Sequence, residues 1–322
     1  MRNKNLLSML FIACMVLTSC GNTVSDDVDV PGTNTEKTNK HISINLNEEN
    51  TSIALSPQSR VFNTDGKRYY AINILEKDNK NYIKYAYGLF DGNAPVSAVM
   101  TEGHKYRIEV LEFRNDKDTL YHEGDMFYEP MKTSDAKATQ LKNAFVYDKS
   151  VNLSGITTGD TRIGAESSDT TWYPRAYKYY AIVDEFDPSS ADKLDITVKR
   201  AFFGLHFIIT PPKHGSVKLL FLRNHTIEVN ATDKAYDDES FYSFNQISNA
   251  AVEGYGTDVA IEATWTSDGK VIKQQKEMVP IKRNAVTNLT IGFSGPKDIE
   301  QVIKEESTPL DTLNHNWVIT SE

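Results

Sequence analysis

The sequence predicts an all-β protein made of two antiparallel β-sandwich domains in tandem. Short runs of residues alternate between apolar and polar side chains, as strands with one buried face do. Turn-forming residues separate these runs about every 8 to 12 residues, which is typical of sandwiches. Helical periodicity is weak and confined to residues 134–143 and 299–305. Of the 322 residues, those after residue 40, about 280, are enough for two ordinary domains or one large sandwich.

The first 22 residues divide as a bacterial export signal does. Arg2 and Lys4 give a positive start, and residues 6–17 give an apolar stretch. This stretch is shorter than the roughly 20 residues that a membrane-spanning helix needs. The tetrapeptide that ends at Cys20 resembles the lipobox of bacterial lipoproteins, which implies a signal peptide at 1–19 and acylation, for example with palmitate, at Cys20. Cys14 would be discarded with the signal, so we expect neither disulfides nor thiol catalysis.

Residues 20–40 are predicted to be a flexible tether, because they are polar and contain few aliphatic side chains. Within them, residues 25–29 form a short acidic run. This run is similar to the export signal that moves Bacteroidetes lipoproteins to the outer face of the outer membrane. It is equally well explained as a solvated linker. The expected location is the outer membrane, with a lipid anchor and an exposure to the cell surface.

Residues 41–165 are predicted to form the first domain. Four of its segments have the pattern of strands: 41–46, 69–75, 82–90 and 105–113. The first alternates strictly, with Ile42, Ile44 and Leu46 on one face. The polar run 76–81 separates the second and third segments, which therefore predict a hairpin.

Residues 176–322 are predicted to form the second domain. Its expected strands are 194–198, 202–209, 217–222, 259–265, 271–275 and 288–293. The sequence Ser-Asp-Gly at 267–269 predicts a hairpin between the fourth and fifth of these strands. A polar stretch before Trp172 predicts a linker at 166–175. Residues 177–186 fit either the last strand of the first domain or the connection to the second.

The charge of the chain argues against nucleic acid as a partner. The chain has 35 Lys and Arg against 44 Asp and Glu. Loss of Arg2 and Lys4 with the signal leaves 33 against 44, a net charge of −11. Binding to phosphates needs clustered basic residues, and the sequence has no such cluster.

No catalytic or metal-binding pattern is present in the sequence. The seven His residues include no pair at zinc-protease spacing, and the nucleophile elbow and the phosphate-binding glycine loop are absent. The adjacent carboxylates at 184–185 and 237–238 would point to opposite faces of a strand, so they do not form a facing catalytic pair. We therefore expect no enzyme activity, no metal and no cofactor.

Aromatic residues raise an alternative function. Trp172 and Tyr173 are candidate glycan contacts, because sugar faces stack on aromatic rings. This reading predicts a surface glycan-binding lipoprotein that serves a nutrient-uptake system. The competing explanation is that Tyr has a high strand propensity and packs well on half-buried surfaces.

Four segments resemble fimbrillin-type lipoproteins of Bacteroidetes. They are 85–91, 102–106, 195–207, where a Lys-Arg pair precedes an apolar strand, and 279–291, which contains Pro-Ile-Lys-Arg-Asn. The resemblance implies two transthyretin-like β-sandwiches that are exported as lipoproteins and assemble into surface fibres used in adhesion. The implied partners are other fimbrial subunits, joined by strand exchange, and proteins or glycans of host or bacterial surfaces.

The same resemblance implies a processing step. In stalk subunits a protease cuts after an arginine and removes the first strand, and a strand from the next subunit fills the groove, which is β-augmentation. The removable strand here would be 42–46, with Arg60 as the first candidate cleavage site and Arg68 as the second. An uncut chain would act as an anchor at the fibre base. Only residues 317–319, near the C-terminus, would suit a donor strand.

Two threonines match a short Asp-Thr-aliphatic pattern on which exported Bacteroidetes proteins are O-glycosylated. They are Thr119 and Thr312. Three-residue patterns recur by chance, so intact-mass measurement of the native protein is the test of this modification.

Overall fold

The computed structural model describes residues 38–49, 67–114, 122–123, 126–127, 139–140, 142–153, 156, 173, 177–294 and 311–320. Most of these residues lie in β-strands, which confirms the all-β prediction. The single helix among them is α1 (Ile247–Ala250). No helix within these ranges is long and apolar enough to cross a membrane.

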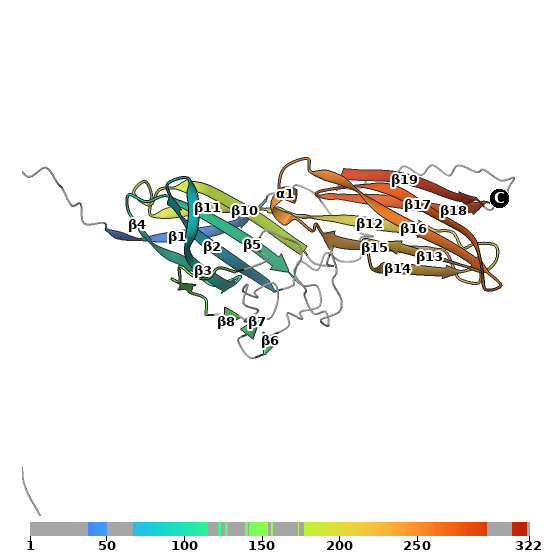
Figure 1. Ribbon diagram of the computed structural model, residues 1–322, viewed down its shortest axis with the longest axis horizontal. Helices are drawn as coiled ribbons and strands as arrows, with labels where there is room; N and C mark the ends of the chain where they lie inside the picture. The colour runs from blue at the N-terminus through green and yellow to red at the C-terminus, as the bar shows by residue number, and fades with distance from the viewer. Residues whose placement is uncertain are drawn as a thin grey trace, which may run out of the picture. The chain divides into compact units, whose positions relative to one another are not determined.

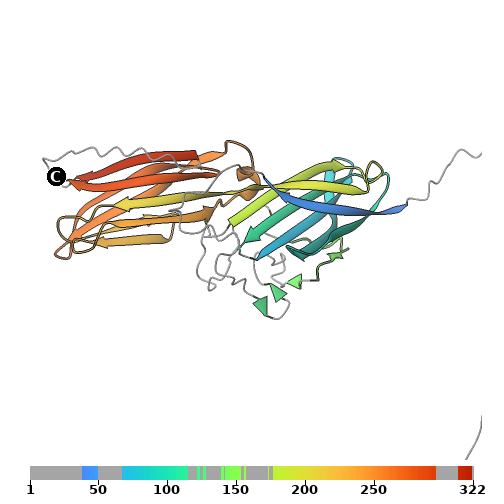
Figure 2. The ribbon, with the colours of Figure 1, turned by 180° about the vertical axis from the view of Figure 1, so that it is seen from behind.

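An eight-stranded sheet contains the first half of the described chain (Figure 1). Its strands are β1 (Asn39–Glu48), β2 (Arg68–Asp78), β3 (Asn81–Asp91), β4 (Val96–Thr101), β5 (Tyr106–Arg114), β9 (Phe145–Val146), β10 (Tyr177–Phe186) and β11 (Lys193–Arg200). Their order across the sheet is β4-β1-β11-β10-β5-β2-β3-β9. The first described strand, β1, therefore lies inside the sheet and has a neighbour on both sides. In Figure 2, β1 is the blue strand beside the yellow-green β11.

This sheet folds over and buries a core between its two ends. One buried cluster joins Ile42 and Ile44 of β1 and Ala98 of β4 with Ile72 of β2 and Ile108 of β5. Strands β10 and β11, which connect the two ends, share only two directly paired positions. Such a short seam lets the sheet change direction there. The result is a sandwich-like layer of β4, β1 and β11 over the remaining strands.

Two four-stranded sheets contain the second half of the described chain. Their strands are β12 (Phe202–Ile209), β13 (Ser216–Phe221), β14 (His225–Asn230), β15 (Tyr236–Ser243), β16 (Gly256–Ser267), β17 (Lys270–Lys282), β18 (Ala285–Ser294) and β19 (Asp311–Thr320). One sheet has the order β15-β12-β18-β19 and the other β14-β13-β16-β17. A small third sheet contains β6 (His122–Glu123), β7 (Met126–Phe127) and β8 (Thr139–Gln140).

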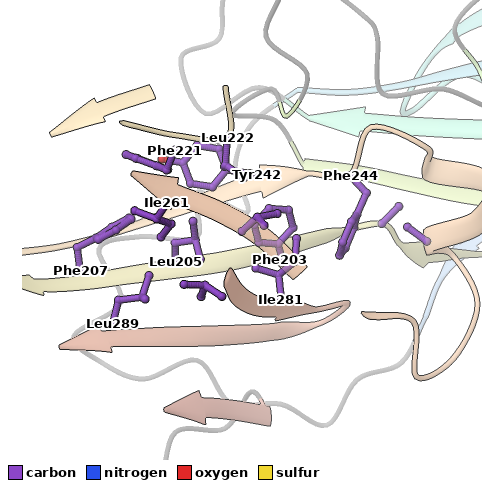
Figure 3. Close-up of a cluster of buried hydrophobic side chains, with 14 of the residues drawn as sticks. Phe203, Leu205, Phe207, Phe221, Leu222, Tyr242, Phe244, Ile261, Ile281 and Leu289 are labelled. Carbon is purple, nitrogen blue, oxygen red and sulfur yellow. The ribbon is translucent and has the colours of Figure 1, made fainter. Parts of the chain in front are cut away.

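Side chains from these two sheets meet in one apolar core (Figure 3). Phe203, Leu205 and Phe207 occupy alternate positions of β12, so a strand's period of two directs all three into the core. Ile261 of β16 and Leu289 of β18 reach the same cluster from the two sheets. This arrangement is a β-sandwich, as the alternating sequence predicts.

Most of the expected strands are present, and the two hairpin predictions are confirmed. β2 and β3 pair in antiparallel fashion around a turn at Asn79, and β16 and β17 pair around Asp268 and Gly269. These three residues have φ values of 54°, 51° and 72°, which Asn, Asp and Gly adopt more readily than other residues. The weak helical signal at 134–143 is wrong at residues 139–140, which form β8. Residues 299–305 lie outside the described ranges.

The change from the first sheet to the next falls later than the predicted linker at 166–175. β10 pairs with β5, and β11 pairs with β1, so residues 177–200 belong with the N-terminal strands. The next sheet begins at β12, immediately after Ala201. The polar stretch that suggested the linker instead precedes a strand that returns to the first sheet. As a division into domains, the boundary stays a prediction.

Candidate strand-exchange site

β1 occupies a slot between two strands that are far from it in the sequence. It pairs antiparallel with β4 from Asn39↔Thr101 to Ile44↔Val96, and parallel with β11 from Ser43↔Lys193 to Glu48↔Val198. Both edges of β1 are therefore engaged. The slot is defined here as the space between β4 and β11 that β1 fills.

The inner face of β1 supplies apolar side chains to the core. Ile42 and Ile44 are 0% and 3% exposed, and Leu46 packs partly buried against the same cluster. The outer face is polar and exposed, with Ser43 directly opposite Ser97 of β4. This alternation matches the sequence prediction for residues 41–46, and the strand continues to Glu48.

The connectivity makes β1 separable from the rest of the fold. β1 ends at Glu48, and the next described strand, β2, begins at Arg68. A single backbone cut between Glu49 and Lys67 would therefore leave β1 held in the slot by non-covalent contacts only. Arg60, the first candidate cleavage site, lies in this interval but outside the described residues.

A cluster of charged side chains holds the C-terminal end of β1. The carboxylate of Glu48 accepts a hydrogen bond from Arg68 Nη1 at 2.9 Å and is also paired with Arg114. Arg114 Nε in turn donates to Glu112 at 2.9 Å. The side chains of Glu112 and Arg114 are 0% and 8% exposed, so this part of the cluster is shielded from water.

The next residue, Glu49, is held by a separate set of contacts. Arg283 Nη2 donates to both carboxylate oxygens of Glu49, at 2.7 and 2.8 Å. The backbone N–H of Arg200 also donates to Glu49, at 3.4 Å, and the Glu49 N–H donates to the Val198 carbonyl at 2.9 Å. Arg283 lies between β17 and β18, so Glu49 links the first strand to a turn 234 residues later.

Burial affects the protonation of this cluster. Burial raises the pKa of Glu112, the neighbouring Glu48 raises it further, and Arg114 opposes the rise. Burial also raises the pKa of Tyr70, beside Glu112, and the charge of Glu112 adds to this effect. A carboxylate without water is stable only while cations stay close. The charge of Glu112 therefore depends on the arginines that also hold β1.

Arg68, the second candidate cleavage site, is not in an open loop. It is the first residue of β2 and is paired with Arg114 of β5, and its carbonyl accepts a hydrogen bond from Gly92 N–H at 2.8 Å. A protease that cut after Arg68 would have to separate this residue from the sheet. Arg60 therefore stays the preferred prediction.

The other predicted site residues are distributed widely. Cys20, Thr119 and Trp172 lie outside the described residues. Tyr173 packs partly buried against the second core, and its ring meets Phe203 edge-on at a centroid distance of 5.9 Å. The backbone of Thr312 lies in β19, paired with Val286.

The C-terminal strand, predicted as a possible donor, is docked on its own sheet. β19 pairs in parallel with the whole of β18, from Ala285↔Asp311 to Ser294↔Thr320. Trp317 and Ile319 are 4% and 1% exposed in the second core. β19 lies at the end of its sheet's order, so its outer backbone edge has no neighbouring strand among the described residues.

Of the two adjacent carboxylate pairs that the sequence offered, the pair at 184–185 is bound by cations, and the pair at 237–238 contacts His206, Tyr236 and Ser240. Asp184 is paired with Arg107 and Glu185 with Lys77, each at 2.5 Å. Lys77 and Tyr82, which both donate to Glu185, lower the pKa of this carboxyl to about 2. No group of three or more potential metal ligands occurs among the described residues.

The sequence reasoning missed the charged cluster around Glu48 and Glu49. Its members are dispersed along the chain, so no local motif marks them. The one available signal was the pair of adjacent acids at the end of a strictly alternating strand.

No protein-family model matches the chain, and no curated protein matches it. Similar solved structures include the fimbrial anchor protein Mfa2 from Porphyromonas gingivalis, with 11% identity, a TM-score of 0.34, and coverage of 74% of this chain and 82% of that one. A proposed cell adhesion protein from Bacteroides eggerthii has 10% identity, a TM-score of 0.37, and coverage of 81% and 88%. A proposed polysaccharide-binding protein from Bacteroides thetaiotaomicron has 12% identity, a TM-score of 0.34, and coverage of 73% and 79%. The similarity is weak in all three.

Proposed function

We propose that this chain is a cell-surface lipoprotein that takes part in a fimbrial or adhesive assembly by β-strand addition. The slot between β4 and β11 receives a strand from a partner when β1 has left it. In the uncut chain the lipid anchor would be Cys20, and a cut between Glu49 and Lys67 would release this anchor together with β1. The partner would be another subunit of the same assembly. The chain acts by backbone pairing and not by catalysis.

The observation that carries the proposal is the position of β1. The strand supplies buried side chains to the core and is paired on both sides, yet one cut would remove its covalent link to β2. Loss of β1 would expose backbone N–H and C=O groups on both β4 and β11. Such unpaired edges bind a strand of suitable pattern, with main-chain hydrogen bonds providing affinity and the alternate side-chain positions providing specificity.

A reversible lock on β1 tests the proposal. Ser43 and Ser97 are exposed and directly opposite each other in antiparallel strands. The N–H of Ser43 donates to Asp192, on the β11 side, so Ser43 and Ser97 form a non-hydrogen-bonded pair. Their Cα atoms should be about 4.5 Å apart, a separation that a disulfide can span. The double variant Ser43→Cys/Ser97→Cys would therefore fix β1 in the slot when oxidised.

We expect wild-type cells to yield ladders of detergent-resistant assemblies, and we expect the oxidised double variant to lose them. Reduction should restore the ladder, because it frees β1 again. The single variants Ser43→Cys and Ser97→Cys are matched controls that cannot form the lock. An unchanged ladder from the oxidised double variant would show that assembly does not use the slot.

The glycan-binding alternative gains no specific support from the described residues. Tyr173 is partly buried and packed against Phe203, so its ring is not part of an exposed aromatic platform.

A further inference from the structure

We propose that the arginines at the end of the slot select the partner strand, which must end in two adjacent carboxylates. This inference rests on the proposed strand addition and specifies the chemistry of the partner. The selecting residues are Arg68, Arg114 and Arg283, called here the arginine cluster. The occupant we infer is a β-strand with aliphatic side chains at alternate positions, followed by two acidic residues.

The charge balance of the cluster depends on β1. Three arginines, Arg68, Arg114 and Arg283, pair with three carboxylates, of which Glu48 and Glu49 belong to β1 and only Glu112 belongs to the slot. Departure of β1 would leave the three arginines with Glu112 alone. A strand without acidic residues at these positions would not restore the balance.

Burial makes this balance matter for binding. The side chains of Arg114 and Arg283 are 8% and 5% exposed, so water screens them poorly. Removal of one partner from a buried ion pair is strongly unfavourable, because the other charge stays behind in a poorly solvated site. A neutral strand end would leave Arg283 in that state. The cluster therefore selects against neutral strands more than it stabilises acidic ones.

The contact to Glu49 distinguishes a carboxylate from an amide. Arg283 Nη2 donates to both carboxylate oxygens of Glu49, at 2.7 and 2.8 Å. An amide at this position offers one oxygen and carries no net charge, so it would not reproduce this contact.

The chain's own C-terminal strand does not have the selected pattern. β19 places Leu313, Trp317 and Ile319 at alternate positions, and its final residue is Thr320. No acidic pair closes it, and the indole of Trp317 is much larger than the Ile44 side chain of β1. A second copy offering β19 would therefore fit the slot poorly. The inferred partner strand resembles β1 in chemistry.

Peptide exchange in the full-length chain tests this selection. A site-specific protease sequence inserted after Arg60 allows the chain to be cut while β1 stays bound. Labelled peptides are then added in excess, and the fraction that replaces β1 is measured by size-exclusion chromatography. The probes are residues 38–49, the same peptide with Glu48→Gln and Glu49→Gln, and residues 311–320 as a strand without an acidic pair.

We expect the Glu48→Gln/Glu49→Gln peptide to bind at least about tenfold more weakly than the 38–49 peptide. In a cut chain carrying Arg283→Gln, the difference in affinity between the two peptides should shrink, because the arginine that pairs with Glu49 is absent. The 311–320 peptide should fail to compete. The peptide changes leave the folded receptor untouched, so a difference cannot come from misfolding.

Two results would overturn the inference, and they differ in what else they affect. If the acidic and amide peptides enter the slot equally well, the arginine cluster does not select, while strand addition still holds. If no peptide enters the slot, strand addition fails, and the inference fails with it.

Discussion

At the scale of single residues, three buried charged side chains lie where β1 ends, and they are Glu112, Arg114 and Arg283. Glu48 and Glu49 each contact an arginine that is nearly inaccessible to water. Glu112 completes the group from inside the sheet, and its side chain is fully buried. Such buried ion pairs are weak evidence for stability, because the cost of removing water offsets much of the attraction.

The pH dependence of stability should reveal the buried carboxyl. The pKa of Glu112 is raised above its ordinary value of 4.5, so the folded state binds this proton more tightly than the unfolded state. The free energy of unfolding should therefore fall as the pH rises above about 4.5, by at most about 1.4 kcal/mol per pH unit from this group. Glu112→Gln should remove this contribution, so the variant gains stability relative to the wild type as pH rises.

Urea unfolding of wild type and Glu112→Gln, repeated at intervals of about one pH unit from about pH 4 to about pH 8, measures the difference in stability between them. Glu228→Gln, on an exposed position of β14, controls for the loss of a carboxylate in general. A stability difference between Glu112→Gln and wild type that stays constant with pH would contradict the assignment.

The proposed attachment to the membrane also depends on one residue, Cys20. We expect Cys20→Ser to move the protein from the membrane fraction to the soluble fraction, since acyl chains contribute about 0.8 kcal/mol per buried CH2. Labelling with a fatty-acid analogue, followed by fractionation, measures the change. Cys14→Ser is the matched control, because it lies in the predicted signal peptide and should leave the protein membrane-bound. Retention of the label in Cys20→Ser would show that the anchor lies elsewhere.

At the scale of elements, the two faces of β1 have different roles. Its inner face stabilises the first core, and its outer face and C-terminal end make polar contacts. On the outer face, Asn45 Nδ2 donates to Asp195 of β11 at 2.7 Å. Near the N-terminal end of β1, Lys40 Nζ donates to the Pro188 carbonyl at 2.9 Å.

The core-facing side chain of β1 should determine how firmly the strand is held. Ile42→Ala should lower the free energy of unfolding by about 2–5 kcal/mol, because Ile42 is fully buried and truncation leaves a cavity. The neighbouring Ser43→Ala, on the exposed face, should change it by no more than about 0.5 kcal/mol. Chemical denaturation measures both. Equal effects of the two changes would contradict the orientation of β1.

The local sequence predicted which segments form strands better than it predicted which strands pair with each other. Alternation identified residues 41–46, and Asp268-Gly269 identified a hairpin, because both signals lie within a few residues. The parallel pairing of β1 with β11 joins residues about 150 positions apart, and no local pattern encodes it. For the same reason the polar stretch before Trp172 suggested a boundary, while strand pairing extends the first sheet to Arg200.

The candidate site was also predictable only where its signal is local in the sequence. The slot strand was predicted, because it is a single alternating segment. The arginine cluster was not, because Arg68, Arg114 and Arg283 are 20, 66 and 234 residues from the carboxylates they hold. Only the folded chain brings them together.

At the scale of the whole molecule, the central claim is that a partner's strand replaces β1 between β4 and β11. Position 97 reports on this directly, because Ser97 is exposed and lies opposite Ser43 of β1. A photo-cross-linking amino acid placed there should join whichever strand occupies the slot.

The decisive measurement is mass spectrometry of the cross-linked peptides from assemblies isolated at the cell surface. We predict cross-links from position 97 to a strand of a neighbouring subunit, with two acidic residues at its end. Cross-links only to residues 41–45 of the same chain, in assemblies that are otherwise intact, would contradict the account.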